Sequence, residues 1–239
     1  MQSKMEELKI KLEKFNGADN WSVEKLIEFA GNEFSPKLGI ASSFSIEDVV
    51  LIDLLSKSGK QFKIFSLQTG RLNPETLEVA EQVADKYQKQ IDWFYPIAQE
   101  VEKLELEKGF FSFKESVEER KHCCFIRKVE PLRRALKTLD AWMTGQRKSQ
   151  SVTRASLALV EIDQGHDLFK FNPLANWSYQ QIQDYVKQNK LPYNKLYDLG
   201  YASIGCAPCT RAIKPGEDER AGRWWWESAE HKECGLHLG

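Results

Sequence analysis

Short apolar stretches alternate with stretches of helical spacing over the first hundred residues, and no other feature of the chain constrains its fold as strongly. Residues 37–45 and 61–70 are predicted strands that end in small or polar turns. Residues 46–59 and 73–87 carry apolar side chains at helical spacing, and Pro74 suits the first turn of the second helix. This alternation predicts an α/β fold with a parallel, twisted sheet that helices cover on both faces.

The rest of the chain extends this pattern. Residues 1–34 are predicted to form two short amphipathic helices, and the charged residues 98–120 are predicted to form a loop. Residues 123–136 favour a helix that breaks near Pro131. The other expected elements are a strand at 90–96, a strand at 140–147, a hairpin of 157–163 with 168–174, and a helix at 178–192 with Ser178 as its N-cap.

Charge and hydropathy exclude several classes of protein. The 239 residues include 34 Lys and Arg against 35 Asp and Glu, a net charge of −1. This balance offers no global field for nucleic acid or a membrane surface, so an anion site has to be built locally. No apolar run approaches the roughly 18–20 residues that cross a bilayer, and the charged N-terminus lacks a signal-peptide pattern. We therefore expect a cytoplasmic protein whose cysteines are thiols, metal ligands or catalysts.

Four of the five cysteines form two close pairs. Cys123 and Cys124 are adjacent, and Cys206 and Cys209 form a C-x-x-C pair that follows Gly205. C-x-x-C alone fits a redox dithiol, half of a zinc site or half of a cluster site. Adjacent side chains on a helix point about 100° apart, which suits separate iron corners of a cubane better than one small ion. Four thiolates match a [4Fe–4S] cluster, while a four-cysteine zinc site and inert buried thiols are the alternatives.

The fifth cysteine, Cys234, lies near the C-terminus beside His231, Lys232 and His237. Nearby cationic groups favour the thiolate, which is the nucleophilic form. The neighbouring Gly235 and the proximity of the chain end indicate a movable arm. Two interpretations follow from the residues alone, a catalytic nucleophile and a spare exposed thiol.

Basic residues gather around the cysteine motifs. Guanidinium groups bind phosphate and sulfate, although a single Lys or Arg is more often a solvated surface residue. The loop 41–48 adds hydroxyls and a helix N-terminus, which favours anions, but lacks the pattern of a P-loop. Three successive tryptophans, residues 224–226, cannot all face one side of an element, so at least one is expected to cover a ligand, a partner or the tail. The basic residues are Arg127, Lys128, Arg147, Lys148, Arg154, Arg211, Lys214, Arg220 and Arg223.

Six segments together resemble the iron–sulfur type of assimilatory adenylyl-sulfate (APS) reductase, within the PAPS/APS reductase family. They are SSFSIEDVVL, SLQTGRLNPET, CCFIRKVEPLRRAL, TGQRKSQSVTRA, GYASIGCAPCTRAIKPGEDERAGRWWW and ECGLH. The similarity extends over nearly the whole chain from about residue 36. It implies the adenine-nucleotide α-hydrolase-like fold of the ATP pyrophosphatases, with a flexible C-terminal tail.

The resemblance also implies a division of the chain and a set of site residues. The expected parts are a helical segment at 1–35, a nucleotide-binding reductase domain with an iron–sulfur site at 36–225, and a mobile catalytic tail at 226–239. The implied cluster ligands are Cys123, Cys124, Cys206 and Cys209, and the implied nucleophile is Cys234. The implied substrate contacts are Ser43, Ser45, Glu47 and Asp48 at the nucleotide, Leu67, Thr69 and Gly145 around the adenosine, and Lys128, Arg154, Arg220 and Arg223 at the phosphosulfate. Lys128 is also expected between cluster and substrate, and Gln68 replaces the Asp usual before the TGR turn.

The implied activity is thiol-dependent reduction of APS to sulfite and AMP through an S-sulfocysteine on Cys234. Thioredoxin or a similar dithiol is the expected donor; nucleic acid and membranes are not expected partners, and a homo-oligomer is left open. Members with both cysteine pairs generally prefer APS, and reduction of the 3′-phosphorylated substrate PAPS, alone or in addition, is the alternative. Two other interpretations are an RNA thiolation enzyme, which needs an S-G-G-x-D-S loop not found here, and a nucleotide- or cluster-sensing module, which gains nothing from a reactive tail cysteine.

Overall fold

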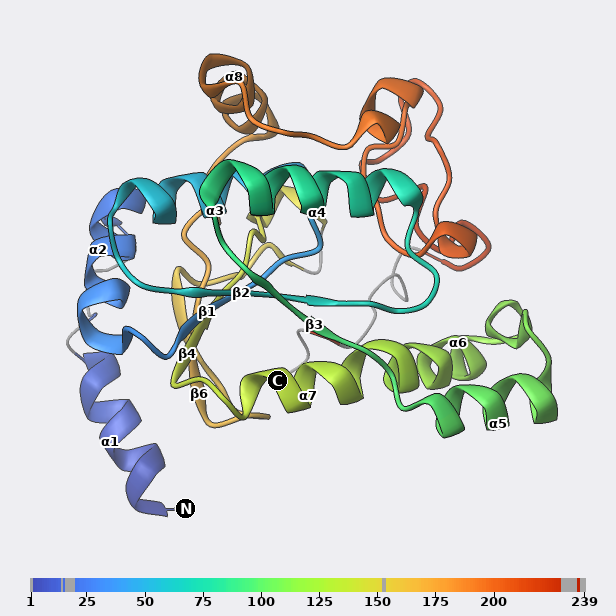
Figure 1. Ribbon diagram of the computed structural model, residues 1–239, viewed down its shortest axis with the longest axis horizontal. Coiled ribbons are helices and arrows are strands. Elements are labelled where there is room, and N and C mark those ends of the chain that lie inside the picture. Colours follow the sequence, from blue (N-terminus) through green and yellow to red (C-terminus); the bar gives the residue numbers. More distant parts are fainter. Residues whose placement is uncertain (1, 14, 16–19, 152–153, 229–235, 237–239) are drawn as a thin grey trace.

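Figure 1 shows the computed structural model, which describes residues 2–13, 15, 20–151, 154–228 and 236. Within these residues a six-stranded sheet has the order β3-β2-β1-β4-β6-β5. Its strands are β1 (Leu38–Ala41), β2 (Lys63–Leu67), β3 (Ile91–Phe94), β4 (Ala141–Met143), β5 (Val160–Asp163) and β6 (Leu168–Phe171). Neighbouring strands pair in parallel except β5, which pairs antiparallel with β6 at the edge. The predicted parallel sheet and hairpin are confirmed.

Helices cover both faces of this sheet, as predicted. The helices are α1 (Gln2–Glu13), α2 (Val23–Phe34), α3 (Ile46–Lys57), α4 (Pro74–Tyr87), α5 (Ala98–Lys108), α6 (Val117–Cys124), α7 (Glu130–Leu136) and α8 (Tyr179–Asn189). In Figure 1, α3 and α4 lie on one face, and α7 lies on the other, where it contacts β2 and β3. α2 and α8 pack against α3, and α1 contacts β5 at the sheet edge. No helix in this described part of the chain is long and apolar enough to span a membrane.

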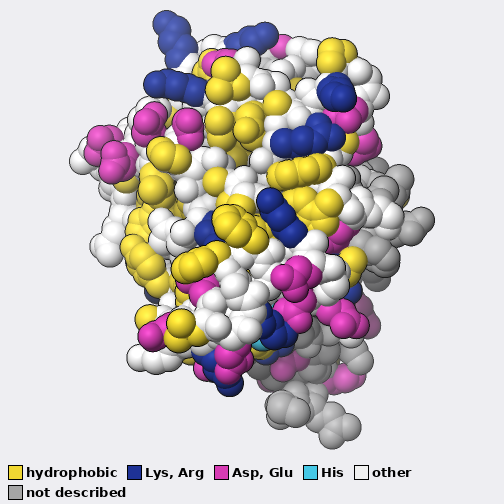
Figure 2. All heavy atoms as spheres, turned by 90° about the vertical axis from the view of Figure 1, so that its right-hand side faces the viewer, with side chains coloured by type: hydrophobic (Ala, Val, Ile, Leu, Met, Phe, Trp, Pro, Cys, Tyr) yellow, Lys and Arg dark blue, Asp and Glu magenta, His cyan; other side chains and the backbone are white. Residues whose placement is uncertain are grey.

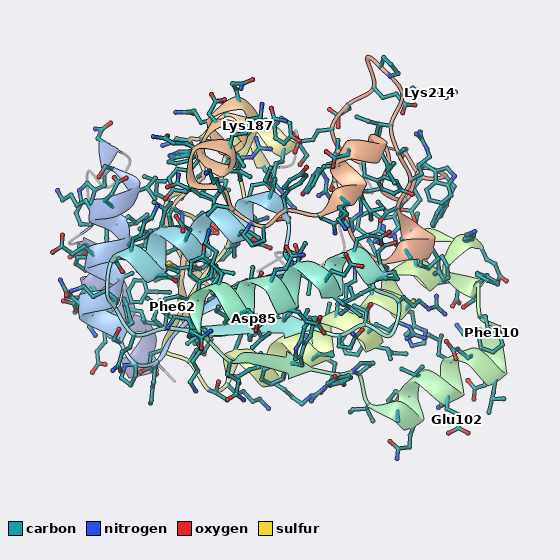
Figure 3. The ribbon with its side chains drawn as sticks, turned by 45° about the horizontal axis from the view of Figure 1, so that its top comes forward. Phe62, Asp85, Glu102, Phe110, Lys187 and Lys214 are labelled. Carbon is teal, nitrogen blue, oxygen red and sulfur yellow. The ribbon has the colours of Figure 1, made fainter. Side chains whose placement is uncertain are left out.

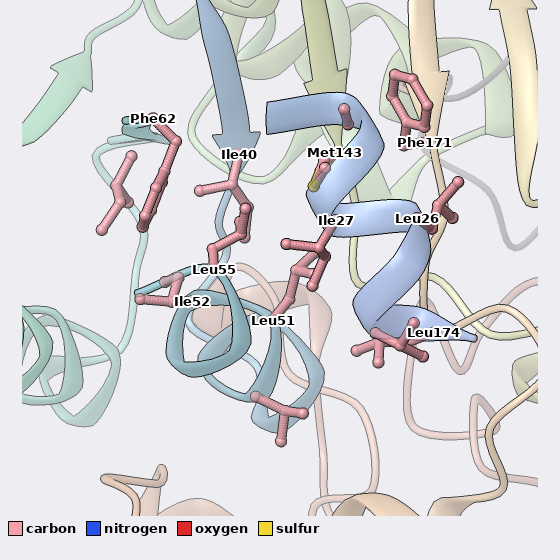
Figure 4. Close-up of a cluster of buried hydrophobic side chains, with 14 of the residues drawn as sticks. Leu26, Ile27, Ile40, Leu51, Ile52, Leu55, Phe62, Met143, Phe171 and Leu174 are labelled. Atoms are coloured by element: carbon pink, nitrogen blue, oxygen red, sulfur yellow. The ribbon is translucent and has the colours of Figure 1, made fainter. Parts of the chain in front are cut away.

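The core is centred on α3, whose surroundings are apolar on nearly every side. A helix that is hydrophobic all round has to be buried, and α3 lies between the sheet, α2, α4 and α8. In Figure 4, Leu51 and Leu55 of α3 lie near Ile27 of α2 and Ile40 of β1, and all four side chains are at most 1 % exposed. Because α3 is held this firmly, the loop that leads into it is fixed relative to the strands.

The segment 98–120 contradicts the predicted loop. It contains α5, a short 3₁₀ turn and the start of α6. Glu, Lys, Gln and Leu are strong helix formers, and Val101 and Leu104 have the spacing that buries one face of α5. The high charge of the segment marks a surface helix rather than a loop.

Pro131 does not break the helical stretch at 123–136. It lies in the first turn of α7, and the helical backbone runs without a break from the preceding π-helical turn through this proline. The irregularity comes earlier, as a π-helical turn at Phe125–Val129 between α6 and α7. Such turns occur often at functional sites.

Replacing Leu55 with Ala tests the importance of the α3 core. The side chain is fully buried, so the loss of apolar contacts and the cavity left behind should lower the free energy of unfolding by about 2–5 kcal/mol. Denaturant unfolding of the anaerobically purified protein measures this change. Leu106→Ala is the matched control, because Leu106 is 79 % exposed and its loss should change the free energy by less than about 0.5 kcal/mol. Equal losses in the two variants would contradict this description of the core.

Candidate active site

A cavity opens at the carboxyl ends of β1, β2 and β4, the edge at which open α/β sheets bind ligands. The loops that follow these strands line it, together with segments 202–206 and 219–224. All the residues that the resemblance placed at the substrate contribute to this lining: Ser43, Ser45, Glu47, Asp48, Leu67, Thr69, Lys128, Gly145, Arg154, Arg220 and Arg223. The structure therefore brings these residues together, and their contacts with a substrate remain predictions.

The loop between β1 and α3 is strained and internally bonded. Phe44 has φ = +56°, a left-handed conformation that costs a bulky residue about 1–3 kcal/mol. Burial of its ring against Trp93 offsets this strain. The Phe44 amide donates to Ser42 Oγ at 3.1 Å, and the Ile46 amide donates to the Tyr197 hydroxyl at 3.1 Å. Because these two amides are already hydrogen-bonded within the protein, the loop and the N-terminus of α3 have fewer free N–H donors for an anion than the sequence predicted.

Asp48 closes the same loop on itself. Its carboxylate accepts hydrogen bonds from the Ser43 amide at 2.6 Å and from the Ser43 hydroxyl at 2.9 Å. The end of β4 lies so close that a Cβ on Gly145 would meet Asp48 Oδ1 at 2.5 Å, which explains the glycine. Burial raises the pKa of Asp48 to about 6, although the hydrogen bonds from Ser43 oppose the shift. The cavity wall thus contains a carboxyl group that titrates near neutral pH.

A buried ion-pair network fixes another part of the cavity wall. The Arg147 guanidinium is fully buried and pairs with Glu47 at 2.9 Å and Glu219 at 2.8 Å. Gln150 donates to the same Glu47 oxygen at 3.0 Å and accepts a hydrogen bond from Arg154. Arg147 was expected among the anion-binding cations. Its two carboxylate partners make it a bridge between segments of the wall instead.

The four paired cysteines lie in one buried cluster. Cys123 and Cys124 end α6, Cys206 precedes a short 3₁₀ turn, and Cys209 is the last residue of that turn. All four are free thiols no more than 8 % exposed. Their neighbours in the cluster are Leu104, Phe113, Ile126 and Trp224. Among the residues that the structure describes, no group of three or more His, Cys, Asp and Glu side chains is arranged to hold a metal ion. The structure brings the four expected ligands into one buried cluster but does not show a metal site. The [4Fe–4S] cluster therefore remains a prediction.

Buried cations lie beside these thiols, one of which, Cys206, itself lines the cavity. The π-helical turn after Cys124 buries both Arg127 and Lys128, and Lys128 also lines the cavity. Burial alone would raise the pKa of the Cys206 thiol, but attraction by Lys128 and a 3.3 Å hydrogen bond with Thr69 contribute to lowering the pKa below its usual value. Cys206, which lines the cavity, therefore becomes a thiolate more readily than Cys123 or Cys209.

The other thiols depend on a different charge balance. Burial and repulsion by Cys206 raise the pKa of Cys209 to about 11. Burial also raises the pKa of Cys123, although Arg71 and Arg127 oppose the shift. A bound cation or cluster would have to displace protons from these two thiols, as thiolate ligation generally requires.

Several buried donors around the thiols have no hydrogen-bond partner within the described structure. They are Arg71 Nη1, Arg127 Nε, Arg223 Nε and Trp224 Nε1. An unsatisfied buried donor costs about 1–3 kcal/mol, so a partner at this position is expected. The sulfur atoms of iron–sulfur clusters accept hydrogen bonds. The donors and the four thiols therefore fit a sulfur-rich, negatively charged group.

The three tryptophans divide between the cavity and the surface. Trp224 is fully buried and lines the cavity, and its expected contact with a ligand, a partner or the tail stays a prediction. Trp226 packs on Phe113 at a centroid distance of 6.0 Å, and Trp225 is 40 % exposed. Figure 2 shows the end of the molecule on the right of Figure 1, where hydrophobic side chains reach the surface among lysines and arginines.

Five of the nine expected cations do not line the cavity: the buried Arg127 and Arg147, and three residues nearer the surface. Arg211 pairs with Glu217 at 2.9 Å. Lys214 is exposed and lies at the outer end of its loop in Figure 3. Lys148 does not line the cavity either. These last three residues follow the commoner pattern of solvated surface charges.

The proposed nucleophile Cys234 lies outside the described residues, as do His231, Lys232, Gly235 and His237. The tail is nevertheless represented at the cavity by one described residue. Leu236 lines the cavity and packs against an apolar cluster that includes Phe65, Leu132 and Trp142.

Sequence reasoning missed several residues of the wall. Glu219 and Tyr197 reach the site through ion pairing and helix capping with residues distant in the chain, and no local pattern announces such pairings. Trp142 and Leu132 form an apolar side of the cavity. The inward position of Trp142 on the predicted strand 140–147 was the signal available for it.

Replacing Asp48 with Asn tests the elevated carboxyl pKa. Because the folded-state pKa lies above the unfolded value of 3.8, the folded protein keeps a proton that the unfolded chain has lost, and stability falls as pH rises from about 4 to 6. The Asn side chain does not titrate, so the variant does not lose stability in this way as the pH rises. Its free energy of unfolding relative to the natural chain should rise by at most about 3 kcal/mol over that range and stay constant above it. Denaturant unfolding at several pH values measures the difference, and a difference independent of pH would contradict the assignment.

Comparisons with known proteins agree with this geometry. Residues 37–212 match the phosphoadenosine phosphosulfate reductase domain. An adenosine 5′-phosphosulfate reductase of Burkholderia cepacia is 51 % identical over 84 % of this chain and 81 % of its own. A phosphoadenylyl-sulfate reductase structure from Candida auris aligns with a TM-score of 0.69 and 30 % identity over 81 % of this chain and 91 % of its own. An FMN adenylyltransferase from Candida glabrata, 13 % identical with a TM-score of 0.56 over 89 % of this chain and 72 % of its own, shares the fold alone. The chain belongs to the phosphoadenosine phosphosulfate reductase family, with the nucleotide-binding fold expected for it.

Proposed function

We propose that this chain reduces adenosine 5′-phosphosulfate to sulfite and AMP. The observation that carries the proposal is a single cavity in which the loop after β1, four cations and one of four clustered thiols meet. The Burkholderia relative, named for this substrate, supports the choice of APS. With this substrate, the chain would be an oxidoreductase that acts on sulfur in the assimilation of sulfate.

The substrate would lie across the carboxyl ends of the strands. Leu67 and Thr69 after β2 and Gly145 after β4 would surround the adenosine, beside Ser43, Ser45, Glu47 and Asp48. Lys128, Arg154, Arg220 and Arg223 line the same cavity and would neutralise the phosphosulfate. Charge neutralisation in a partly dry site stabilises the phosphate of AMP as it leaves.

Cys234 would supply the nucleophile. Its thiolate attacks the sulfur of APS, a sulfur–sulfur bond forms, the sulfur–oxygen bond to phosphate breaks, and AMP leaves with the electron pair. A dithiol such as thioredoxin then attacks Cys234 Sγ and releases sulfite. The second thiol of the donor resolves the mixed disulfide, so the donor is oxidised to a disulfide and supplies both electrons. Leu236 at the cavity supports a tail that closes on the substrate.

Cys123, Cys124, Cys206 and Cys209 would hold a [4Fe–4S] cluster. When bound, the cluster would supply a fixed charge that polarises the anion pocket next to Lys128. Lys128 is buried, attracts the Cys206 thiolate and lines the cavity, so it lies where it can link the thiols with a bound anion. The orphaned donors of Arg71, Arg127 and Arg223 support this assignment.

The remaining assignments belong to the same proposal. We infer a helical segment at 1–35, a reductase domain at 36–225 and a catalytic tail at 226–239, in a cytoplasmic enzyme. Reduction of PAPS is the second candidate, because the aligned Candida auris structure is named for that substrate. Comparing kcat/KM for the two nucleotides decides between them, and a higher value for PAPS would overturn the choice of APS.

Replacing Cys234 with Ser should abolish sulfite formation. The hydroxyl is a far weaker nucleophile than a thiolate, so turnover should fall below detection. Iron and sulfide content and AMP affinity should stay unchanged, since the substitution leaves the cavity and the clustered thiols intact. Mass spectrometry of the natural chain mixed with APS should show an added SO₃ on Cys234. A fully active variant would overturn the mechanism.

Replacing Lys128 with Ala should lower kcat/KM for APS by about 10²-fold, because a cation aimed at developing negative charge is lost. Iron content should fall much less than activity. Lys214→Ala is the matched control, because Lys214 is exposed and outside the cavity. Unaltered kinetics in Lys128→Ala would contradict its assigned role.

A further inference from the structure

Trp224 is held in a conformation that its residue type disfavours. Its φ is +40°, and the residue is fully buried in the wall of the cavity. A bulky residue at positive φ persists only where its surroundings over-determine it, and such strain concentrates at functional sites. The Trp224 amide donates to the Cys209 carbonyl at 3.1 Å, which ties this strained residue to the thiol cluster.

Three cations surround the Trp224 ring. The guanidinium carbons of Arg120 and Arg223 each lie 4.7 Å from its centroid, and Lys128 Nζ lies 5.8 Å away. Cations at these distances are attracted by the ring face. Lys128 and Arg223 line the cavity, whereas Arg120 does not. The Trp224 ring is therefore in contact with one cation outside the cavity lining and with two cations that belong to it.

Arg120 is itself fixed by a buried ion pair. Its Nε and Nη2 each donate to a different oxygen of Glu227 at 2.8 Å, and the two side chains are 0 % and 4 % exposed. A bidentate pair of this kind sets the plane of the guanidinium as well as its position. On α6, Arg120 also hydrogen-bonds with the Cys124 thiol one turn later. One guanidinium thus joins α6, Trp224 and the segment that leads into the tail.

We propose that Arg120, held by Glu227, is a positioning residue that keeps Trp224 in its strained conformation and so aims Lys128 and Arg223 at the sulfate end of the substrate. The proposal rests on the function proposed above. Arg120 is not among the residues that line the cavity and acts through the Trp224 ring, which is. When the pair is broken, Trp224 relaxes, and the two cavity cations lose the surface against which they are ordered.

The affinity for the sulfate group isolates this effect. In a Cys234→Ser background, which holds APS without turnover, isothermal titration of the anaerobically purified protein gives Kd for APS and for AMP. Adding Glu227→Gln should reduce the preference for APS over AMP by tenfold or more, while Kd for AMP changes less than threefold. Glu227→Gln keeps the shape of the side chain and one hydrogen-bond acceptor. A variant that retains the preference for APS, or that binds APS and AMP more weakly by the same factor, would overturn the positioning role.

A second variant guards against misfolding. The double variant Arg120→Met, Glu227→Met removes the Arg120–Glu227 ion pair, called the clamp below, without leaving a buried charge unpaired. Proteins often tolerate such a change. It should lose the same preference, and a folded double variant that keeps it would refute the proposal. Glu130→Gln is the matched control, because it breaks the partly exposed Arg134–Glu130 pair of α7 and should leave both affinities unchanged. If the Cys234→Ser parent itself shows no preference for APS, the proposed function fails together with this inference; loss confined to the clamp variants supports both.

Discussion

Positive charge buried beside thiols is the constraint on which the rest of this structure depends. Lys128 and Arg223 are almost inaccessible to water, and burial of a cation is costly unless negative charge lies near it. The Cys206 thiol supplies negative charge near these cations, because its pKa is lowered and it ionises more readily than usual. An anionic substrate on one side and a thiolate-bound inorganic group on the other would bring further negative charge to these cations. The site is therefore organised by attraction between buried cations and the negative groups beside them.

The parallel sheet brings the segments that carry these charged groups to one edge. Strand ends that are distant in sequence meet at one edge, so the loops after β1, β2 and β4 form one wall without long excursions. Close approach is then a matter of side-chain size, as Gly145 shows beside Asp48. The same principle applies at Gly205, where a Cβ would collide with the Arg223 guanidinium. Rigid strands and small residues together hold the charged groups at short range.

Much of the fold could be predicted from local pattern, and the site only from chemistry-bearing motifs. The strands at 37–45 and 61–70 combine apolar composition with clear turn residues, which made them readable. The segment 98–120 misled because a surface helix with one narrow apolar face resembles a charged loop. The two cysteine pairs indicated their own association, since few other arrangements explain four thiols so spaced. The Arg120–Glu227 pair could not be foreseen, because ion pairing between distant segments leaves no periodic signal in either one.

The π-helical turn at Phe125–Val129 gives this part of the chain an unusual sensitivity to length. In a regular α-helix, neighbouring residues point about 100° apart, so a narrow face accommodates one of them better than two. The wider turn lets Arg127 and Lys128 both be buried, three and four residues after Cys124. Deleting one residue there would restore ordinary helical geometry and rotate the cations relative to the thiols. Chain register, rather than residue identity alone, is thus part of what this segment encodes.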